Sequence, residues 1–202
     1  MHTWDVLLIG GASGLGKSRA AARLAAQRGA FTVEFDDVVA ALQAATTAAT
    51  HPGLHHFSTP QDGPDTSPDT SPDADRVLEL QIATARALDD ALLGVVRNRL
   101  SVDVPAVVEG DYLTPAAAAR CAAEAERWGR RVRALFLHEA DPERISANYA
   151  HREPDRGPQS ERAAVSARYC AWLAGQARAH GLPVVDCRPY DTLAERMAAV
   201  LA

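Results

Sequence analysis

A glycine-rich stretch near the start of the chain, GGASGLGKS from Gly10 to Ser18, carries the residues best suited to binding phosphate groups. Its spacing, a glycine followed after four residues by glycine, lysine and serine, is the phosphate-loop pattern. Backbone N–H groups of such a loop turn toward one centre and cradle a polyphosphate. The loop residues expected to do so here are Gly11, Ala12, Ser13, Gly14, Leu15 and Gly16. The Lys17 ammonium would reach the β- and γ-phosphates and the Ser18 hydroxyl would bind Mg²⁺, so the loop predicts binding of Mg-ATP.

The lysine of this loop is unusual in the composition of the chain. Of the 21 basic residues, 20 are arginine, and Lys17 is the only lysine. A planar guanidinium cannot replace a compact ammonium inside a nest of backbone amides. The single lysine therefore stands where lysine chemistry is needed, which favours triphosphate binding over an ordinary glycine-rich turn.

Two aspartates follow the second apolar segment, in the sequence VEFDD. In parallel α/β sheets, ligands bind outside the carboxyl ends of the strands. Asp36 or Asp37 could there accept the proton of an attacking hydroxyl. Either could instead cap the helix expected to follow. Both are therefore candidates for the catalytic base.

The segment VPAVVEGDYL places two further carboxylates after an apolar strand. An acidic residue at this place usually holds Mg²⁺, directly or through its waters. Glu109 is expected to share the metal with Ser18, and Asp111 is either its substitute or a contact to the acceptor.

Arginines on two later loops complete the candidate site. The stretch NYAHREPDRGPQSER contains two prolines and a glycine between helical segments, which is typical of a hinged lid around residues 150–162. Arg152 and Arg156 would close over the γ-phosphate during transfer, unless the stretch is only a solvated turn. Arg188 follows the last predicted strand, where its loop would cover the nucleotide base.

Five short apolar segments predict the strands that position these residues: Trp4–Ile9, Phe31–Phe35, Pro105–Val108, Val132–Leu137 and Leu182–Val185. Alanine-rich helical segments lie between them. This alternation predicts βαβ units with right-handed crossovers, and so a three-layer α/β sandwich. Asp141 followed by Pro142 predicts the start of one helix.

One stretch does not fit the alternation. Residues 51–75 contain five of the twelve prolines and the tandem DTSPDTSPDAD, so we expect a flexible insertion on the acceptor side. A single long helix is expected to follow over Arg76–Leu100. The 202 residues would form one domain with this insertion and the lid.

Composition excludes several classes of protein. A net charge of −5 and scattered arginines disfavour a nucleic-acid binder. The N-terminal stretch MHTWDVLLIGG lacks a basic region and a long apolar run, so no leader or membrane span is expected. Three unpaired cysteines (Cys121, Cys170 and Cys187) suit a reducing cytoplasm. The oligomeric state is left open between monomer and homodimer.

Charge also constrains the acceptor. From Asp36 to Asp111 there are thirteen acidic residues and four arginines, and no arginine or lysine lies between Ala40 and Asp75. A phosphorylated acceptor needs cations in a closed site, since an unpaired dianion is costly there. A neutral or cationic hydroxyl compound is therefore favoured.

Together these segments resemble the P-loop kinases of small molecules, the nucleoside-monophosphate-kinase-like group. VVEGDYLTP is similar to the corresponding segment of 2-phosphoglycerate kinases, and GGASGLGKS followed by EFDD is similar to chloramphenicol phosphotransferases, whose catalytic aspartate would fall on Asp36. The resemblance implies a five-stranded sheet of order 2-3-1-4-5, Mg-ATP as donor, and lid closure before transfer.

The function expected from the sequence is ATP-dependent transfer of a phosphoryl group to a hydroxyl of a small, non-anionic molecule. The alternatives are a kinase of a phosphorylated small molecule, a nucleotide-dependent switch without an acceptor, and a catalytically idle relative.

Overall fold

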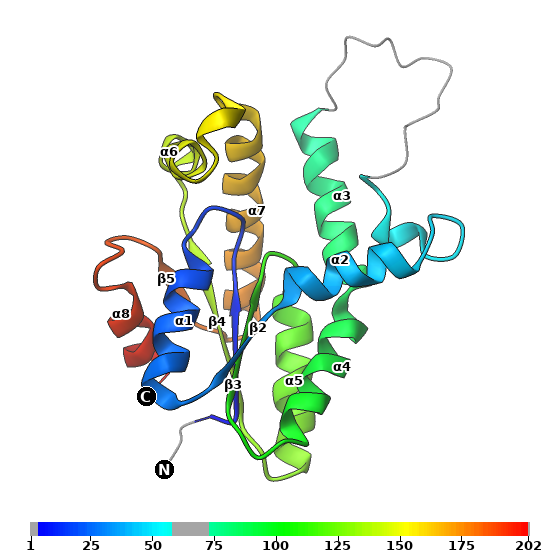
Figure 1. The fold of residues 1–202 in the computed structure, drawn as a ribbon, viewed down its shortest axis with the longest axis vertical. Helices are drawn as coiled ribbons and strands as arrows, with labels where there is room; N and C mark the ends of the chain where they lie inside the picture. Colours follow the sequence, from blue (N-terminus) through cyan, green and yellow to red (C-terminus); the bar gives the residue numbers. More distant parts are fainter. Residues whose placement is uncertain (1–3, 58–72, 202) are drawn as a thin grey trace.

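The computed structural model describes residues 4–57 and 73–201, which form a parallel sheet with helices on both faces (Figure 1). The sheet has five strands in the order β2-β3-β1-β4-β5. Their bounds are β1 Val6–Gly10, β2 Phe31–Glu34, β3 Ala106–Gly110, β4 Val132–His138 and β5 Val184–Asp186. The predicted fold class and strand order are confirmed.

The central position of β1 in the sheet explains why its sequence is apolar up to the glycines. All five residues of β1 are buried, because β3 and β4 pair with it on either side. In register, Ile9 lies beside Glu109, and Gly10 lies between Gly110 and Phe136. A Cβ atom on Gly10 would lie 2.3 Å from the Phe136 ring, so only glycine fits at this crossing.

Helices form the two outer layers. One face of the sheet is covered by α1 and α8, and the other by α4, α5 and α7, while α2, α3 and α6 lie toward the carboxyl ends of the strands (Figure 1). The helix bounds are α1 Lys17–Arg28, α2 Phe35–Ala45, α3 Ala74–Ala87, α4 Asp89–Leu100, α5 Pro115–Arg127, α6 Pro142–Arg152, α7 Ser160–Ala179 and α8 Leu193–Val200. Two short 3-10 turns, Pro52–Leu54 and Pro154–Arg156, precede α3 and α7.

Local signals explain several helix starts. Asp141 caps α6 as predicted, since its carboxylate accepts a hydrogen bond from the Glu143 amide at 2.9 Å. The Thr114 hydroxyl similarly accepts from the Ala117 amide at the start of α5, at 3.0 Å. Each cap satisfies an amide that the helix itself leaves without a partner.

The structure corrects two expectations about elements. The long helix predicted over residues 76–100 is two helices, with a break at Leu88, because α3 packs against α7 whereas α4 packs against α5. The second strand ends one residue early, at Glu34, so Asp36 and Asp37 lie in the first turn of α2 and not on the strand. Most of the predicted insertion at residues 51–75 lies outside the described residues.

No helix within the described part of the chain has both the length and the apolar character needed to cross a membrane.

Candidate active site

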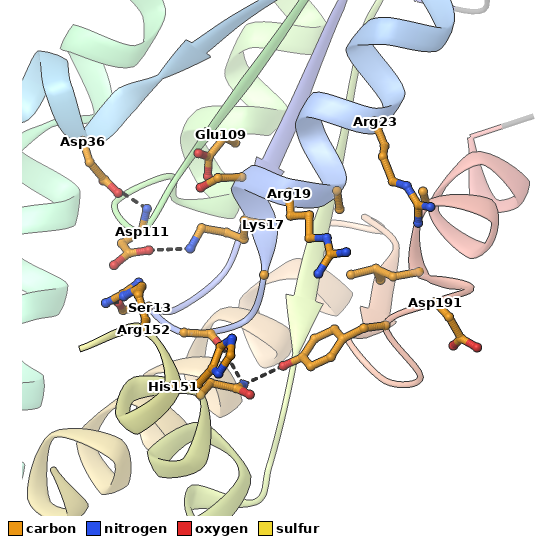
Figure 2. Close-up of a pocket in the computed structure, with 18 residues that line it drawn as sticks. Ser13, Lys17, Arg19, Arg23, Asp36, Glu109, Asp111, His151, Arg152 and Asp191 are labelled. Carbon is orange, nitrogen blue, oxygen red and sulfur yellow. Dashed lines mark hydrogen bonds and ion pairs between the residues drawn. The ribbon is translucent and has the colours of Figure 1, made fainter. Parts of the chain in front are cut away.

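A cavity of about 940 Å³ opens at the carboxyl ends of the strands, around the glycine-rich loop (Figure 2). Its lining comes from the loop and α1, from the first turn of α2, from the end of β3, from the end of α6, and from the segment after β5. The topology therefore brings together residues that are up to 181 positions apart in the sequence, Ser13 and Ala194. This is the place where parallel α/β sheets bind ligands.

The loop depends on its glycines at two positions. Gly14 and Gly16 have φ values of +83° and +78°, a left-handed conformation that other residues rarely adopt. A Cβ on Gly14 would also lie 3.0 Å from the Tyr149 ring. The loop then leads directly into α1, whose N-terminal end points its free amides and positive dipole toward the cavity.

Not every residue predicted for the loop faces the cavity. Ser13, Gly14, Gly16, Lys17 and Ser18 line it. The other three loop residues, Gly11, Ala12 and Leu15, are buried and do not line the cavity.

Two residues of α6 fix the loop from behind, and sequence reasoning missed both. The Asn148 side-chain amide donates to the Gly14 carbonyl at 2.7 Å. The buried Tyr149 hydroxyl donates to the Ser13 carbonyl at 3.3 Å and lies 2.8 Å from the Ser166 hydroxyl. No local pattern in the sequence around Asn148 and Tyr149 indicates that they contact a loop about 134 residues earlier.

Lys17 is the only cation enclosed by the loop among the residues the structure describes. Its side chain is 6% exposed, donates to the Ala12 carbonyl at 3.0 Å, and forms an ion pair with Asp111. Burial alone would lower the pKa of Lys17, but the charge and hydrogen bond of Asp111, together with the charges of Glu109 and Asp36, raise it. The side chain is therefore a fixed ammonium, ready to neutralise phosphate.

Asp36 and Asp37 differ in their position relative to the cavity. The Asp36 carboxylate lines the cavity and accepts a hydrogen bond from the Asp111 amide at 3.1 Å (Figure 2). Burial, followed by the negative charge of Asp111, raises the pKa of Asp36 to about 6, although Lys17 opposes the shift. Both residues are exposed, but Asp37 does not line the cavity, so the structure brings Asp36 alone toward Lys17.

Glu109 lies at the floor of the cavity beside Ser18. Its side chain is 3% exposed, and burial raises its pKa, while a hydrogen bond from the Ser18 hydroxyl and the charge of Lys17 act in the opposite direction. These are oxygen donors of the kind Mg²⁺ prefers. The described residues contain no group of three or more acidic, histidine or cysteine ligands. That agrees with Mg²⁺ sites of this kind, which use one or two protein oxygens together with substrate phosphates.

The arginines of the predicted lid form ion pairs with a single glutamate. Glu153 forms ion pairs with Arg152 at 2.6 Å, Arg162 at 3.0 Å and Arg156 at 3.5 Å. The hydrogen bond from Arg152 is the largest influence that lowers the pKa of Glu153, to about 2. Arg152 lines the cavity and donates to the Ser13 hydroxyl at 3.4 Å, whereas Arg156 is 72% exposed and lies outside the lining. The structure thus brings Arg152 to the site and leaves Arg156 away from it.

Arg188 supports the cavity wall but is not part of it. Its guanidinium donates to Glu139 at 3.2 Å and to the Asn148 side chain at 3.4 Å, and it stacks over the Tyr190 ring at 4.7 Å. Tyr190 itself lines the cavity next to Gly16 and accepts from Asn148 at 2.6 Å. The loop after β5 thus reaches the cavity through Tyr190, and Arg188 lies behind it.

A comparison with protein families supports this picture. A model of the AAA_33 family, described as an AAA domain, matches residues 6–174. That range runs from β1 to α7 and includes the glycine-rich loop, Asp36, the β3 carboxylates and the lid segment. Among curated proteins, no sequence matches the chain.

Solved structures share the fold at low sequence identity. A shikimate kinase from Acinetobacter baumannii in complex with shikimate aligns over 98% of this chain and 93% of its own, with a TM-score of 0.52 and 13% identity. A gluconokinase from Sinorhizobium meliloti aligns over 98% and 91%, with a TM-score of 0.54 and 18% identity. A shikimate kinase from Bacteroides thetaiotaomicron aligns over 97% of both chains, with a TM-score of 0.51 and 10% identity. The fold is therefore the P-loop fold of small-molecule kinases.

Proposed function

The chain belongs to the AAA_33 family of AAA domains, and on this basis we propose that it is a kinase that transfers the γ-phosphoryl group of ATP to a hydroxyl of a small, non-anionic molecule. The observation that carries the proposal is the arrangement of Lys17, Asp36 and Asp111 in one cavity at the glycine-rich loop. A buried ammonium for the phosphates lies next to a carboxylate suited to take a proton.

In this mechanism, the loop amides and Lys17 bind the β- and γ-phosphates, with the positive end of α1 directed at them. Asp36 orients the acceptor hydroxyl and takes its proton. The acceptor oxygen forms a bond to the γ-phosphorus, the bond from that phosphorus to the ADP oxygen breaks, and ADP leaves. The Asp36 proton then passes to solvent.

Mg²⁺ would be held by Ser18, with Glu109 fixing it directly or through its waters. Bound Mg²⁺ neutralises charge on the β- and γ-phosphate oxygens during transfer. Ser18 and Glu109 already contact each other, so the metal's protein ligands need no rearrangement to meet it.

The segment 150–162 is proposed to close over the bound nucleotide. Arg152 is the arginine of this segment that already reaches the loop, through Ser13. A modest shift of its guanidinium from Glu153 toward the γ-phosphate would add charge stabilisation and exclude water. Arg156 would contribute only after a larger movement.

The acceptor is proposed to be non-anionic because of the charges around its site. Asp36, Glu109 and Asp111 all line the cavity near Lys17, and a further anion would face all three. We also propose a cytoplasmic location, since all three cysteines are buried and unpaired.

The test is ADP release from Mg-ATP, measured with a pool of hydroxylated, non-phosphorylated compounds and separately with a pool of phosphorylated ones. We expect stimulation by the first pool, lost in Asp36→Asn. Stimulation only by the second pool would overturn the non-anionic acceptor. No stimulation by either, with intact ATP binding, would overturn the kinase and favour a nucleotide-dependent switch.

A further inference from the structure

Asp111 lines the cavity, but the mechanism proposed above gives it no part in phosphate binding or proton transfer. Its carboxylate is 20% exposed, faces the cavity, and is ion-paired with Lys17 (Figure 2). Both of its backbone groups are fixed: the amide donates to Asp36 at 3.1 Å, and the carbonyl accepts from the Tyr169 hydroxyl at 3.1 Å. These two contacts fix the backbone of Asp111 at the cavity, and its carboxylate is paired with Lys17.

Nucleotide binding, as proposed above, takes away the partner of this carboxylate. The ammonium of Lys17 cannot stay on Asp111 and also neutralise the β- and γ-phosphates, because the phosphates carry the larger charge. The other cavity-lining arginines within residues 4–57 and 73–201 are Arg19, Arg23 and Arg152. Figure 2 shows Arg19 and Arg23 on α1, on the other side of Lys17 from Asp111.

The third arginine is also committed. Arg152 is paired with Glu153 and extends toward Ser13 and the phosphate position. Once ATP is bound, with Mg²⁺ held by Ser18 and Glu109 as proposed above, the Asp111 carboxylate loses its side-chain partner Lys17 in a closing site. A charge in that situation is unfavourable unless a new partner arrives.

We infer that Asp111 binds a protonated amine of the acceptor, so that the substrate is a compound carrying both the hydroxyl to be phosphorylated and an ammonium group. The inference rests on the proposed kinase function and narrows its acceptor. Lys17 shows directly that a primary ammonium fits against this carboxylate. Because Asp36 contacts the Asp111 amide, the hydroxyl and the amine would lie only a few bonds apart.

The exchange of partners predicts an order of binding. Without nucleotide, Asp111 is occupied by Lys17 and the amine has no free carboxylate to bind. With a non-hydrolysable ATP analogue and Mg²⁺, glucosamine or another amino alcohol should bind about fivefold tighter or more, a coupling typical of linked sites. Asp111→Asn should remove this dependence on nucleotide. Calorimetry measures it without turnover.

The kinetic test uses related acceptors with and without a protonated amine. Glucosamine, N-acetylglucosamine and glucose form one such series, and ethanolamine with N-acetylethanolamine forms another. ADP release should favour the amine member by about tenfold or more in kcat/KM, since a neutral analogue would leave the Asp111 carboxylate unpaired in the closed site. Asp111→Asn should abolish this preference mainly through KM. Asp103→Asn, at an exposed site near Arg130, is the control that should keep it.

Four results would overturn the inference, and each is distinguishable from the others. If the wild-type protein phosphorylates neutral acceptors as well as amines, the inference fails while the kinase stands, whether or not the variant folds. If Asp111→Asn raises the Mg²⁺ requirement equally for every acceptor, Asp111 serves the metal. If it only tightens ATP binding, Asp111 is a counter-ion for Lys17. Transfer to no acceptor at all would refute the proposed function, and this inference with it.

Discussion

The raised pKa of Asp36 makes a quantitative prediction about proton transfer. Burial and the charge of Asp111 raise this pKa to about 6, from an ordinary value of 3.8. If Asp36 is the base, activity requires its carboxylate and must fall as pH drops through about 6. By the titration relation, the ionised fraction is about 91% at pH 7 and about 9% at pH 5, so kcat/KM should fall about tenfold between them.

The assay is ADP release at saturating Mg-ATP between pH 5 and 8, with Asp36→Asn and Asp37→Asn measured beside the wild type. Asp36→Asn should lower the rate by a factor of about 10² to 10⁴ and should leave no dependence on a group near pH 6. Asp37→Asn should keep both the rate and the profile, because Asp37 is exposed and does not line the cavity. ATP affinity, measured separately, should change little in either variant.

Two results would refute this reasoning. A profile that stays flat down to pH 5 would mean that Asp36 has an ordinary pKa or takes no proton. Equal losses in the two variants would mean that the first turn of α2 matters for its structure and that neither carboxylate is specifically the base. Carbon NMR of the aspartate carboxyl groups provides an independent check, since one resonance should titrate near pH 6 and disappear in Asp36→Asn.

Three further predictions test the metal site, the loop and the lid. Glu109→Gln should raise the Mg²⁺ concentration for half-maximal activity by about ten- to a hundredfold, and an unchanged Mg²⁺ titration would contradict its metal role. Gly14→Ala should lose ATP binding, because its φ of +83° is strained for alanine and its Cβ would meet the Tyr149 ring at 3.0 Å. Gly129→Ala, at φ +68° with nothing within 4 Å, is the matched control and should bind ATP normally. Glu153→Gln should speed amide hydrogen exchange across residues 150–162 severalfold, since one carboxylate holds the arginines there, and equal exchange rates would show that it does not order the lid.

Much of the fold followed from local patterns in the sequence. The five apolar segments became the five strands, and for β1 and β3 the reason is that a parallel strand buried on both faces is mainly apolar. The break at Leu88 could not be predicted from local patterns, because the apolar face continues through it. The chain turns there because α3 packs against α7 whereas α4 packs against α5. Local periodicity carries no information about which helix packs on which.

In the candidate site, too, residues set by local sequence patterns could be predicted and residues set by tertiary contacts could not. The loop and Lys17 could be predicted because their function requires particular residues at fixed spacing. The choice of Asp36 over Asp37 could not, because it depends on the contact with the Asp111 amide, which lies 75 positions away. Asn148 and Tyr149 were missed for the same reason, as contacts across the tertiary structure leave no local pattern.

The central claim is that the γ-phosphoryl group of ATP is transferred to a small molecule at the Lys17 loop. The most direct measurement follows labelled γ-phosphoryl from ATP into the pooled hydroxyl compounds, for the wild type and for Lys17→Met. The account predicts a labelled product that contains the acceptor, and its loss in Lys17→Met, whose apolar side chain cannot neutralise phosphate. Labelled phosphate released only to water, or a labelled acceptor formed equally by Lys17→Met, would contradict it.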